Sequence, residues 1–265
     1  GEMPLGNKKV RLIQRSLEED SCREVSDIGH TRIYRTDRLG MPLIETVTYP
    51  DMTNPDEVKE ACNYIRFLGR STGKVRTGMG AGRQDVNVSC KGGARVEIKG
   101  VAHSRWIPEL THNECFRQWA LLAIRDQLNA RVPDAKSWAI SHAFLDVHVF
   151  NSRNGFTKEA KANGLKLVAV NLPGFKGILS HFTQPGKVFA NELIERLKVI
   201  ACIEIPNMAH SEENDPLFAA AEWEKITTLL KAGENDAQLI IRGPEEDIQT
   251  ALETVEERCR MAFAG

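Results

Sequence analysis

The sequence predicts an α+β protein in which an antiparallel sheet region is followed by a smaller α+β unit. Residues 30–50 and 83–99 carry the alternation and the β-branched residues that are typical of strands. Other segments have apolar residues at helical spacing, and from Gly164 onward strand-like and helix-like segments follow one another. A strand-rich first part and a compact tail that contains both strands and helices together predict the α+β class.

Composition limits the classes of protein to consider. The chain has 265 residues and a formal net charge of −1, which suits one large domain or two modest ones. No apolar run approaches the roughly 18–20 residues that a membrane helix needs, so we expect no membrane association. The near-neutral charge argues against a strongly basic nucleic-acid-binding domain, and any polyanion site must be a local patch.

The six cysteines are scattered along the chain, without a C-x-x-C pair. This pattern predicts neither a zinc ribbon nor a disulfide framework. Because no signal-peptide pattern is present either, we expect a cytoplasmic protein with free thiols.

The first third of the chain is predicted to hold strands and one helix. Residues 10–13 form a short strand candidate, and residues 30–37 and 43–49 form two further strands. A helix begins at Asn54-Pro55, because proline suits the first turn and the two acids that follow favour the positive end of the helix dipole. Apolar residues at helical spacing continue to Gly69.

A glycine-rich loop, residues 77–82, precedes two strands of alternating polarity. The loop lacks the spacing of a dinucleotide fingerprint and the Gly-Lys-Ser/Thr of a nucleotide loop, so a turn is favoured over a phosphate cradle. The strands cover residues 83–89 and 94–99, and in each of them every second residue is polar. A three-residue loop, residues 91–93, would put both polar sets on one face of a hairpin.

This hairpin register predicts a densely polar sheet face. It sets Asn87 opposite Glu97 and Asp85 opposite Lys99. Such a face is either a solvated surface with cross-strand ion pairs or a site held by rigid strands. Both interpretations stay open at this point.

A long helix is predicted from Pro108 to about Leu128, followed by one or two strands in residues 138–150. Its inward-facing stripe would contain Phe116, Trp119, Ala120 and Ala123. Loop-like residues after position 150 predict a domain boundary, with domains at 1–150 and 151–265.

The second domain alternates between strands and helices. Strands are predicted at 165–172 and 237–242, and helices at 188–199 and 217–230. Gly243-Pro244 leads into a last helix, whose inward stripe would contain Ile248, Leu252, Val255 and Cys259.

Few motifs in the chain point to chemistry when each is taken alone. Glu18, Glu19 and Asp20 offer oxygen ligands of the kind that Mg²⁺ prefers, although adjacent acids are more often a solvated surface. The chain has no H-E-x-x-H metal motif and no G-x-S-x-G nucleophile elbow.

Four segments taken together carry a family resemblance: residues 17–20, residues 37–45 with Pro50-Asp51, residues 82–89 and residues 92–99. Their order and spacing resemble the B/E subunit family of tRNA-dependent amidotransferases, which convert Glu-tRNA(Gln) to Gln-tRNA(Gln). The glycine-rich approach to the third segment is more similar to the archaeal E type than to the B type. Residues 172–177 and the later strand, Gly-Pro and helix resemble a domain inserted in the E type and in bacterial-type aspartyl-tRNA synthetases.

The resemblance implies a fold for both domains. Residues 1–150 would be the C-terminal part of a cradle-shaped catalytic domain with an antiparallel sheet. Residues 151–265 would be the inserted α+β domain (GAD-like), which we expect to be ferredoxin-like. The chain would then be a fragment of a longer subunit, inactive by itself.

The resemblance also implies a ligase of the glutaminyl-tRNA synthase (glutamine-hydrolysing) type. It would use ATP and Mg²⁺ to convert the glutamyl carboxylate into an acyl phosphate, which ammonia then attacks. The implied partners are Glu-tRNA(Gln) and an asparaginase-like glutaminase of the D type, in a homo- or hetero-oligomer. The resemblance implies four metal ligands: Glu18, Glu19, Glu45 and Asp85. The implied catalytic residues are Glu19, Asp85, Lys99 and Arg83. The implied ATP-binding residues are Glu45, Asn87, Glu97 and Arg95.

Departures from the family pattern leave an alternative open. The family usually has histidine where this chain has Ser16, and a small residue, glycine and lysine where it has residues 21–23. A missing histidine ligand would weaken or alter a metal site. The chain could therefore be a non-catalytic tRNA-binding or assembly paralogue, or an enzyme of the family with another substrate. Binding of Mg²⁺ or ATP would separate the catalytic and non-catalytic interpretations.

Overall fold

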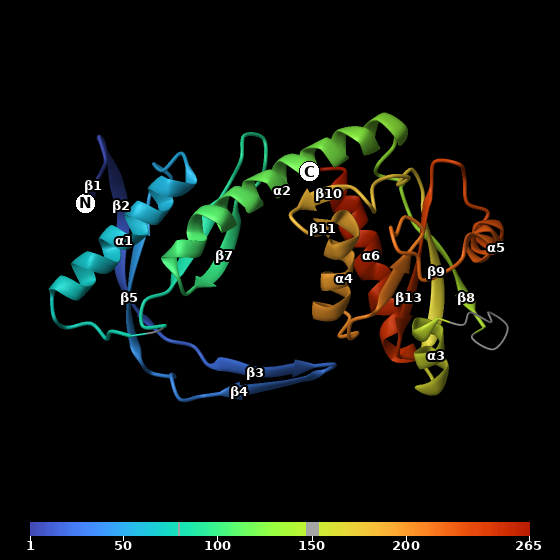
Figure 1. Ribbon diagram of the computed structural model, residues 1–265, viewed down its shortest axis with the longest axis horizontal. Coiled ribbons are helices and arrows are strands. Elements are labelled where there is room, and N and C mark those ends of the chain that lie inside the picture. Colours follow the sequence, from blue (N-terminus) through green and yellow to red (C-terminus); the bar gives the residue numbers. More distant parts are fainter. Residues whose placement is uncertain (79, 147–153) are drawn as a thin grey trace. The chain divides into compact units, whose positions relative to one another are not determined.

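The computed structural model describes residues 1–78, 80–146 and 154–265, which fall into two compact units (Figure 1). The first unit contains residues 1–27 and 32–118, and the second contains residues 28–31 and 119–265. Separate antiparallel sheets and helices make up both units, which confirms the predicted α+β class. The domain boundary predicted at 150/151 lies outside the described residues, and so does Met79 of the glycine-rich loop.

A three-stranded antiparallel sheet, in the order β1-β2-β5, forms the frame of the first unit. The strands are β1 (Glu2–Leu5), β2 (Lys8–Glu19) and β5 (Pro42–Thr48). Strand β2 is far longer than the predicted strand at residues 10–13. The prediction missed its second half because those residues are mostly exposed and lack an alternating apolar pattern. An extra residue at Ile13 shifts the register between β2 and β5, so the alternation changes phase there.

Helix α1 (Pro55–Ser71) begins as predicted and ends two residues beyond Gly69. Its first turn is capped by Asn54, whose Oδ1 accepts a hydrogen bond of 3.0 Å from the Glu57 N–H. The buried Ala61 of this helix packs with apolar side chains of β1 and β2, namely Met3, Leu5 and Val10.

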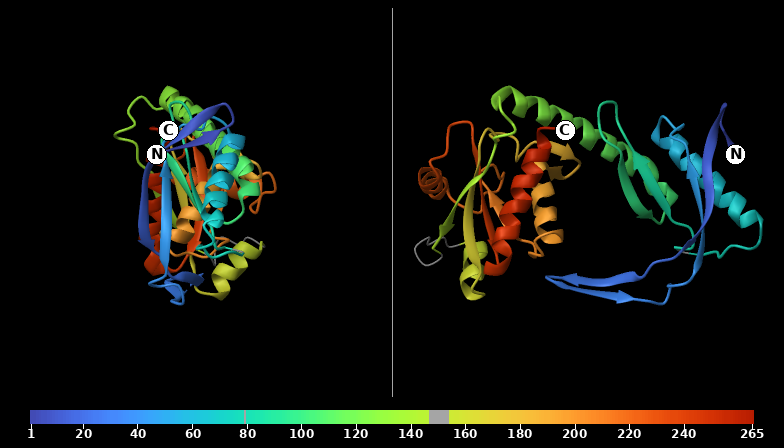
Figure 2. Two further views of the ribbon diagram at one scale, coloured as in Figure 1. Left: turned by 90° about the vertical axis from the view of Figure 1, so that its left-hand side faces the viewer. Right: turned by 180° about the vertical axis from the view of Figure 1, so that it is seen from behind.

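Two hairpins follow, and both lie in the first unit except for residues 28–31 at the tip of one. Strands β3 (Arg23–Ile28) and β4 (Thr31–Arg35) form a two-stranded ribbon (Figures 1 and 2). Its residues are largely exposed. Strands β6 (Gln84–Val88) and β7 (Val96–Val101) form the hairpin predicted from the alternating segments. Its apolar face packs on Ile107, which follows the short 3₁₀ helix η1 (Ser104–Trp106).

Helix α2 (Ile107–Arg131) agrees with the predicted range, but the predicted stripe is only partly correct, because Ala120 is buried whereas Trp119 is exposed. Trp119 is 59% exposed. The first half of the helix buries two polar residues, Glu114 and Gln118, and the second half buries Ile124 and Leu128 in the apolar cluster of the second unit. The prediction for Trp119 is wrong because a single apolar stripe was assumed for the whole helix, whereas its two halves bury different kinds of residue.

The second unit is built on a four-stranded antiparallel sheet in the order β12-β13-β9-β8. Its strands are β8 (Ser141–Leu145), β9 (Lys166–Leu172), β12 (Met208–His210) and β13 (Ala237–Gly243), and its helices are α3 (Gly155–Ala162), α4 (Phe189–Val199), α5 (Ala220–Leu230) and α6 (Ile248–Ala262). The smaller elements are β10 (Phe182–Gln184), β11 (Lys187–Val188) and η2 (Glu245–Asp247). These bounds confirm the predicted strands and helices from residue 165 onward. Residues 147–150, predicted as strand, lie outside the described residues.

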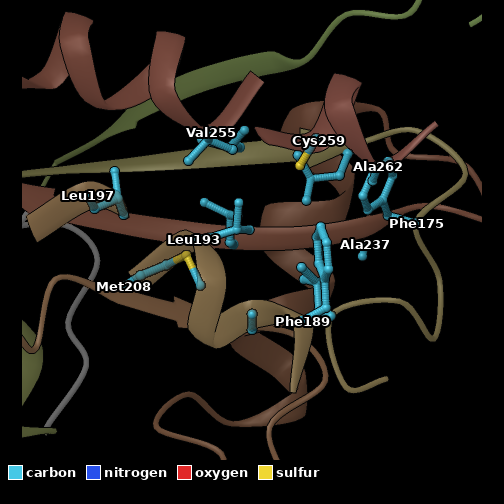
Figure 3. Packing of buried hydrophobic residues seen from close by; sticks show 14 of the residues in the cluster. Phe175, Phe189, Leu193, Leu197, Met208, Ala237, Val255, Cys259 and Ala262 are labelled. Carbon is cyan, nitrogen blue, oxygen red and sulfur yellow. The ribbon is translucent and has the colours of Figure 1, made fainter. Parts of the chain in front are cut away.

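Helices cover both faces of this sheet (Figures 1 and 2). Helices α4 and α6 pack on one face through the cluster seen in Figure 3, where Phe189 and Leu193 lie near Val255 and Cys259. Helices α3 and α5 pack on the other face around Phe218. The second unit is thus α+β as expected. Its sheet lies between two helical layers, so helices are not confined to a single face. None of the helices described here combines the length and the apolar character needed to cross a membrane.

Candidate active site

The first part of the candidate site lies on one face of strands β2 and β5. Ser16 is paired with Glu45 across the two strands. The Ser16 hydroxyl donates a hydrogen bond of 3.0 Å to Glu18 Oε1, and its Oγ lies 3.5 Å from Glu45 Oε2. Alternation along β2 puts Ser16 and Glu18 on the same face, so this small cluster follows from the strand register.

Glu19 is oriented differently from Glu18. Neighbouring residues of a strand point to opposite faces, and the Glu19 carboxylate accepts a 2.9 Å hydrogen bond from the Gly40 N–H. Gly40 has φ = +77°, a left-handed conformation that favours glycine in this turn before β5. Glu19 therefore anchors the turn between β4 and β5 in this structure.

The available oxygen ligands fit only part of what Mg²⁺ requires. Mg²⁺ is commonly held by one or two carboxylates together with substrate phosphates and water. Glu18 and Glu45, both within reach of one hydroxyl, fit that requirement as a pair. Across residues 1–78, 80–146 and 154–265, no three or more histidine, cysteine or acidic side chains are arranged to hold a metal ion. The four predicted ligands therefore do not form one cluster in the described structure.

The second part of the candidate site is the polar face of the β6–β7 hairpin. Asn87 lies opposite Glu97, as predicted. Asp85 is not directly opposite Lys99, because the register shifts between Gln84 and Val86 and β7 has an extra residue there. The prediction of that pairing was wrong since a bulge cannot be read from alternation alone.

The predicted polar residues of this hairpin contact one another nevertheless. The Lys99 Nζ lies 3.8 Å from Asp85 Oδ2 and 3.4 Å from Glu97 Oε2. Arg95 donates a 2.6 Å hydrogen bond to Asn87 Oδ1, and the Gly100 N–H donates one of 2.7 Å to Asp85 Oδ1. The expected cross-strand ion pair of Asp85 and Lys99 is thus present despite the altered register.

A buried carboxylate that the sequence-based assignment left out lies beside the predicted Arg83. Asp20, at the end of β2, is 6% exposed. Its Oδ1 accepts a 2.7 Å hydrogen bond from Arg83 and one of 2.8 Å from the Ser21 N–H, while its Oδ2 lies 3.7 Å from Arg38 Nε. Asp20 adjoins two predicted ligands in sequence, but its partners lie 18 and 63 residues away, so no local pattern could have found them.

Two opposing effects act on the pKa of Asp20. Burial is the largest and raises the pKa, whereas the hydrogen bonds from Arg83 and Ser21 and the nearby positive charge of Arg38 lower it. The net result is a pKa below the usual value for aspartate, so the carboxylate is ionised at neutral pH.

All residues of the predicted site belong to the first unit. On the first sheet, Glu18 and Glu45 lie beside each other at the Ser16 hydroxyl. On the hairpin, Asp85 forms an ion pair with Lys99, and Asn87 accepts a hydrogen bond from Arg95. Arg83 donates a hydrogen bond to Asp20. Glu19 is directed to Gly40 and away from the Glu18–Glu45 cluster. The arrangement offers paired carboxylates on one sheet and a mixed cationic and anionic face on another.

Comparison with known proteins gives a consistent answer. Residues 2–214 match the GatB/GatE catalytic domain. Proteins named as the E subunit of glutamyl-tRNA(Gln) amidotransferase are 38% identical in Methanocaldococcus jannaschii, 35% in Sulfolobus acidocaldarius and 37% in Thermococcus sibiricus. Each alignment covers 100% of this chain but only 42%, 42% and 41% of the respective relative. The match extends over most of the chain and includes every residue of the candidate site, and the chain therefore belongs to the GatB/GatE family.

Proposed function

We propose that the protein to which this chain belongs carries out the ATP-dependent conversion of Glu-tRNA(Gln) to Gln-tRNA(Gln). The observation that carries the proposal is the similarity along the whole chain to proteins named as the E subunit of this amidotransferase. The chain spans about two-fifths of the length of these relatives, so the reaction is proposed for the complete protein in the cytoplasm with its partners.

The proposed reaction has two steps. A carboxylate oxygen of the tRNA-bound glutamate attacks the γ-phosphorus of ATP, the bond to the bridging oxygen breaks, and ADP leaves. Ammonia then attacks the carbonyl carbon of the acyl phosphate, inorganic phosphate leaves with the electron pair, and the nitrogen loses a proton to give the amide. The ammonia would come from an asparaginase-like glutaminase of the D type.

Glu18 and Glu45 are the proposed ligands for Mg²⁺, with Glu19 and Asp85 as further candidates. When bound, Mg²⁺ would neutralise phosphate charge. The Ser16 hydroxyl orients Glu18 through their hydrogen bond of 3.0 Å. Glu19 and Asp85 each accept one backbone N–H, which leaves each carboxylate further acceptor capacity.

The cationic residues would stabilise the charge that develops on the transferred phosphoryl group. Lys99 is held between Asp85 and Glu97, and Arg95 is held by Asn87. Arg83 is fixed by Asp20. The Arg83 side chain is fixed most firmly, because its partner Asp20 is buried, whereas Lys99 and Arg95 are exposed on the hairpin face. This grouping of cations supports the assignment of the polar hairpin face to ATP and the acyl phosphate.

Activity of the complete protein tests the proposal directly. The full-length protein and its glutaminase partner are incubated with Glu-tRNA(Gln), ATP, Mg²⁺ and glutamine, and the amino acid released from the tRNA is identified. We expect glutamine only when ATP is present. Unchanged glutamate with tRNA still bound would overturn the proposal and favour a non-catalytic tRNA-binding paralogue, the alternative that Ser16 supports.

A variant of Glu45 tests the role of the carboxylate pair. In the full-length enzyme we expect Glu45→Gln to lower kcat by about 100-fold or more, since loss of a charged group that stabilises the transition state costs about 3 kcal/mol. Raising the Mg²⁺ concentration should recover part of the activity. The matched control is Glu24→Gln, which removes an exposed carboxylate on β3 outside the cluster. Equal activity of both variants would exclude Glu45 from the site.

A further inference from the structure

Asp20 lies where the two sheets of the candidate site meet. Its N–H donates a 2.9 Å hydrogen bond to the Met41 carbonyl just before β5, which ties the end of β2 to the carboxylate-bearing sheet. Its side chain reaches Arg83, the residue that precedes β6. One buried residue thus connects the strand that carries Glu18 with the hairpin that carries Asp85.

The geometry of the arginine pair suits an anion. A guanidinium has five N–H donors, and the 2.7 Å bond to Asp20 engages one terminal nitrogen of Arg83. Arg38 approaches the other carboxylate oxygen with a buried Nε that has no hydrogen-bond partner in the described structure. Two guanidinium groups around one carboxylate leave one net positive charge at this junction.

Burial makes this contact more than a surface ion pair. Exposed ion pairs contribute little to stability, and solvent lets their side chains move. Asp20 is only 6% exposed and is also fixed by the Ser21 N–H. A carboxylate held this firmly restricts the orientation of the arginine bound to it.

We propose that Asp20 is a positioning residue that holds Arg83, and with it the start of β6, against the end of β2, so that the remaining Arg83 donors are presented to an anionic group of the substrates. The inference rests on the proposed function and adds to it a residue that acts through Arg83.

A double-mutant cycle in the full-length enzyme with its partner tests this assignment. We expect Asp20→Asn to lower kcat about 10- to 100-fold, with the KM for ATP changed less than threefold, as for other residues that orient a functional group. Arg83→Lys should cause a similar or larger loss. Because Asp20 acts through Arg83, the double variant should be no slower than Arg83→Lys alone. Losses that multiply in the double variant would overturn the proposal.

The matched control is Asp51→Asn, which removes the carboxylate of another close ion pair in the same unit, 2.7 Å from Arg11. We expect it to leave kcat and KM unchanged. If Asp20→Asn does not fold, as judged by its thermal unfolding, Asp20→Glu takes its place, since it keeps the charge but moves the carboxylate by one methylene.

A crystal structure of the Asp20 variant supplies a readout that does not need activity. We expect the Arg83 guanidinium to move from its native position, and an unmoved Arg83 would overturn the positioning role. If the wild-type enzyme forms no glutamine, the proposed function fails, whereas the displacement of Arg83 still decides the positioning role by itself.

Discussion

The acidic residues of the first unit differ in how their charge is compensated. Asp20 is buried and bound by Arg83, whereas Asp51 is held in a more open position by the backbone and side chain of Arg11. The hydrogen bonds from Arg11 lower the pKa of Asp51 to about 2. Similar contacts from Lys8 and Thr53 lower the pKa of Glu57 to about 2.

The Asp51 contact predicts a defined pH dependence. A carboxylate whose pKa is lower in the folded state stabilises the fold fully above its unfolded pKa of about 4, and this stabilisation disappears as the pH falls through about 2. We therefore expect the wild-type protein to lose stability more steeply between about pH 4 and pH 2 than the Asp51→Asn variant. Urea unfolding at a series of pH values measures this. Parallel curves for the two proteins would contradict it.

At the level of secondary-structure elements, the β6–β7 hairpin is held by one buried side chain of α2. Gln118 accepts a 2.9 Å hydrogen bond from the Cys90 N–H and donates one of 3.0 Å to the Val88 carbonyl. A second donation of 2.9 Å goes to Glu114. These bonds satisfy the backbone at the end of β6, next to the polar residues of the candidate site.

Close packing at Gly93 makes this attachment testable. A Cβ at this position would lie 2.8 Å from Gln118 Oε1 and 3.0 Å from Cys90 Sγ, so one of them must shift. We expect Gly93→Ala to destabilise the first unit by roughly 1–3 kcal/mol through overpacking and loss of the Gln118 bonds. The control is Gly82→Ala, whose new Cβ meets its nearest atom at 3.8 Å. Equal urea midpoints for the two variants would show that the hairpin accommodates the methyl group.

Some elements and strand pairings could be predicted from local sequence patterns, and others could not. The start of α1 was predictable, because Asn54 and Pro55 are local signals of a helix N-terminus. The pairing of Asn87 with Glu97 was predictable because parity fixes a hairpin register. The bulge in β7 opposite Asp85 and the buried side of α2 were not predictable, since each depends on what another segment of the chain places beside it.

On the scale of the whole molecule, the two units have cores of very different size. The first unit has two small apolar clusters, one around Met3 and Val10 and the other around Val86 and Ile107. The second unit has an extensive cluster across its sheet, α4 and α6 (Figure 3), and another on the opposite face. Some large apolar side chains of the first sheet are exposed and contribute nothing to its core, for example Leu17, which is 76% exposed.

This difference predicts unequal protection of the backbone. Because local stability follows buried apolar contacts, we expect amide hydrogens of β2 and β5 to exchange with solvent faster than those of β9 and β13. Hydrogen exchange of the isolated chain, followed by mass spectrometry, measures both sets in one sample. Equal protection of the two sheets would mean that the units unfold together.

The sequence by itself determined the α+β class, the start of α1, the β6–β7 pairing, the strands β9 and β13, the helices α4, α5 and α6, and the family, because these depend on local periodicity, turn residues and motifs in order. Only the tertiary structure decided that Glu18 shares a cluster with Glu45 while Glu19 turns to Gly40, and that Asp20 is buried between Arg83 and Arg38. The physical reason is that these contacts join residues far apart in the chain, and their geometry is set by strand register and burial that no local pattern records.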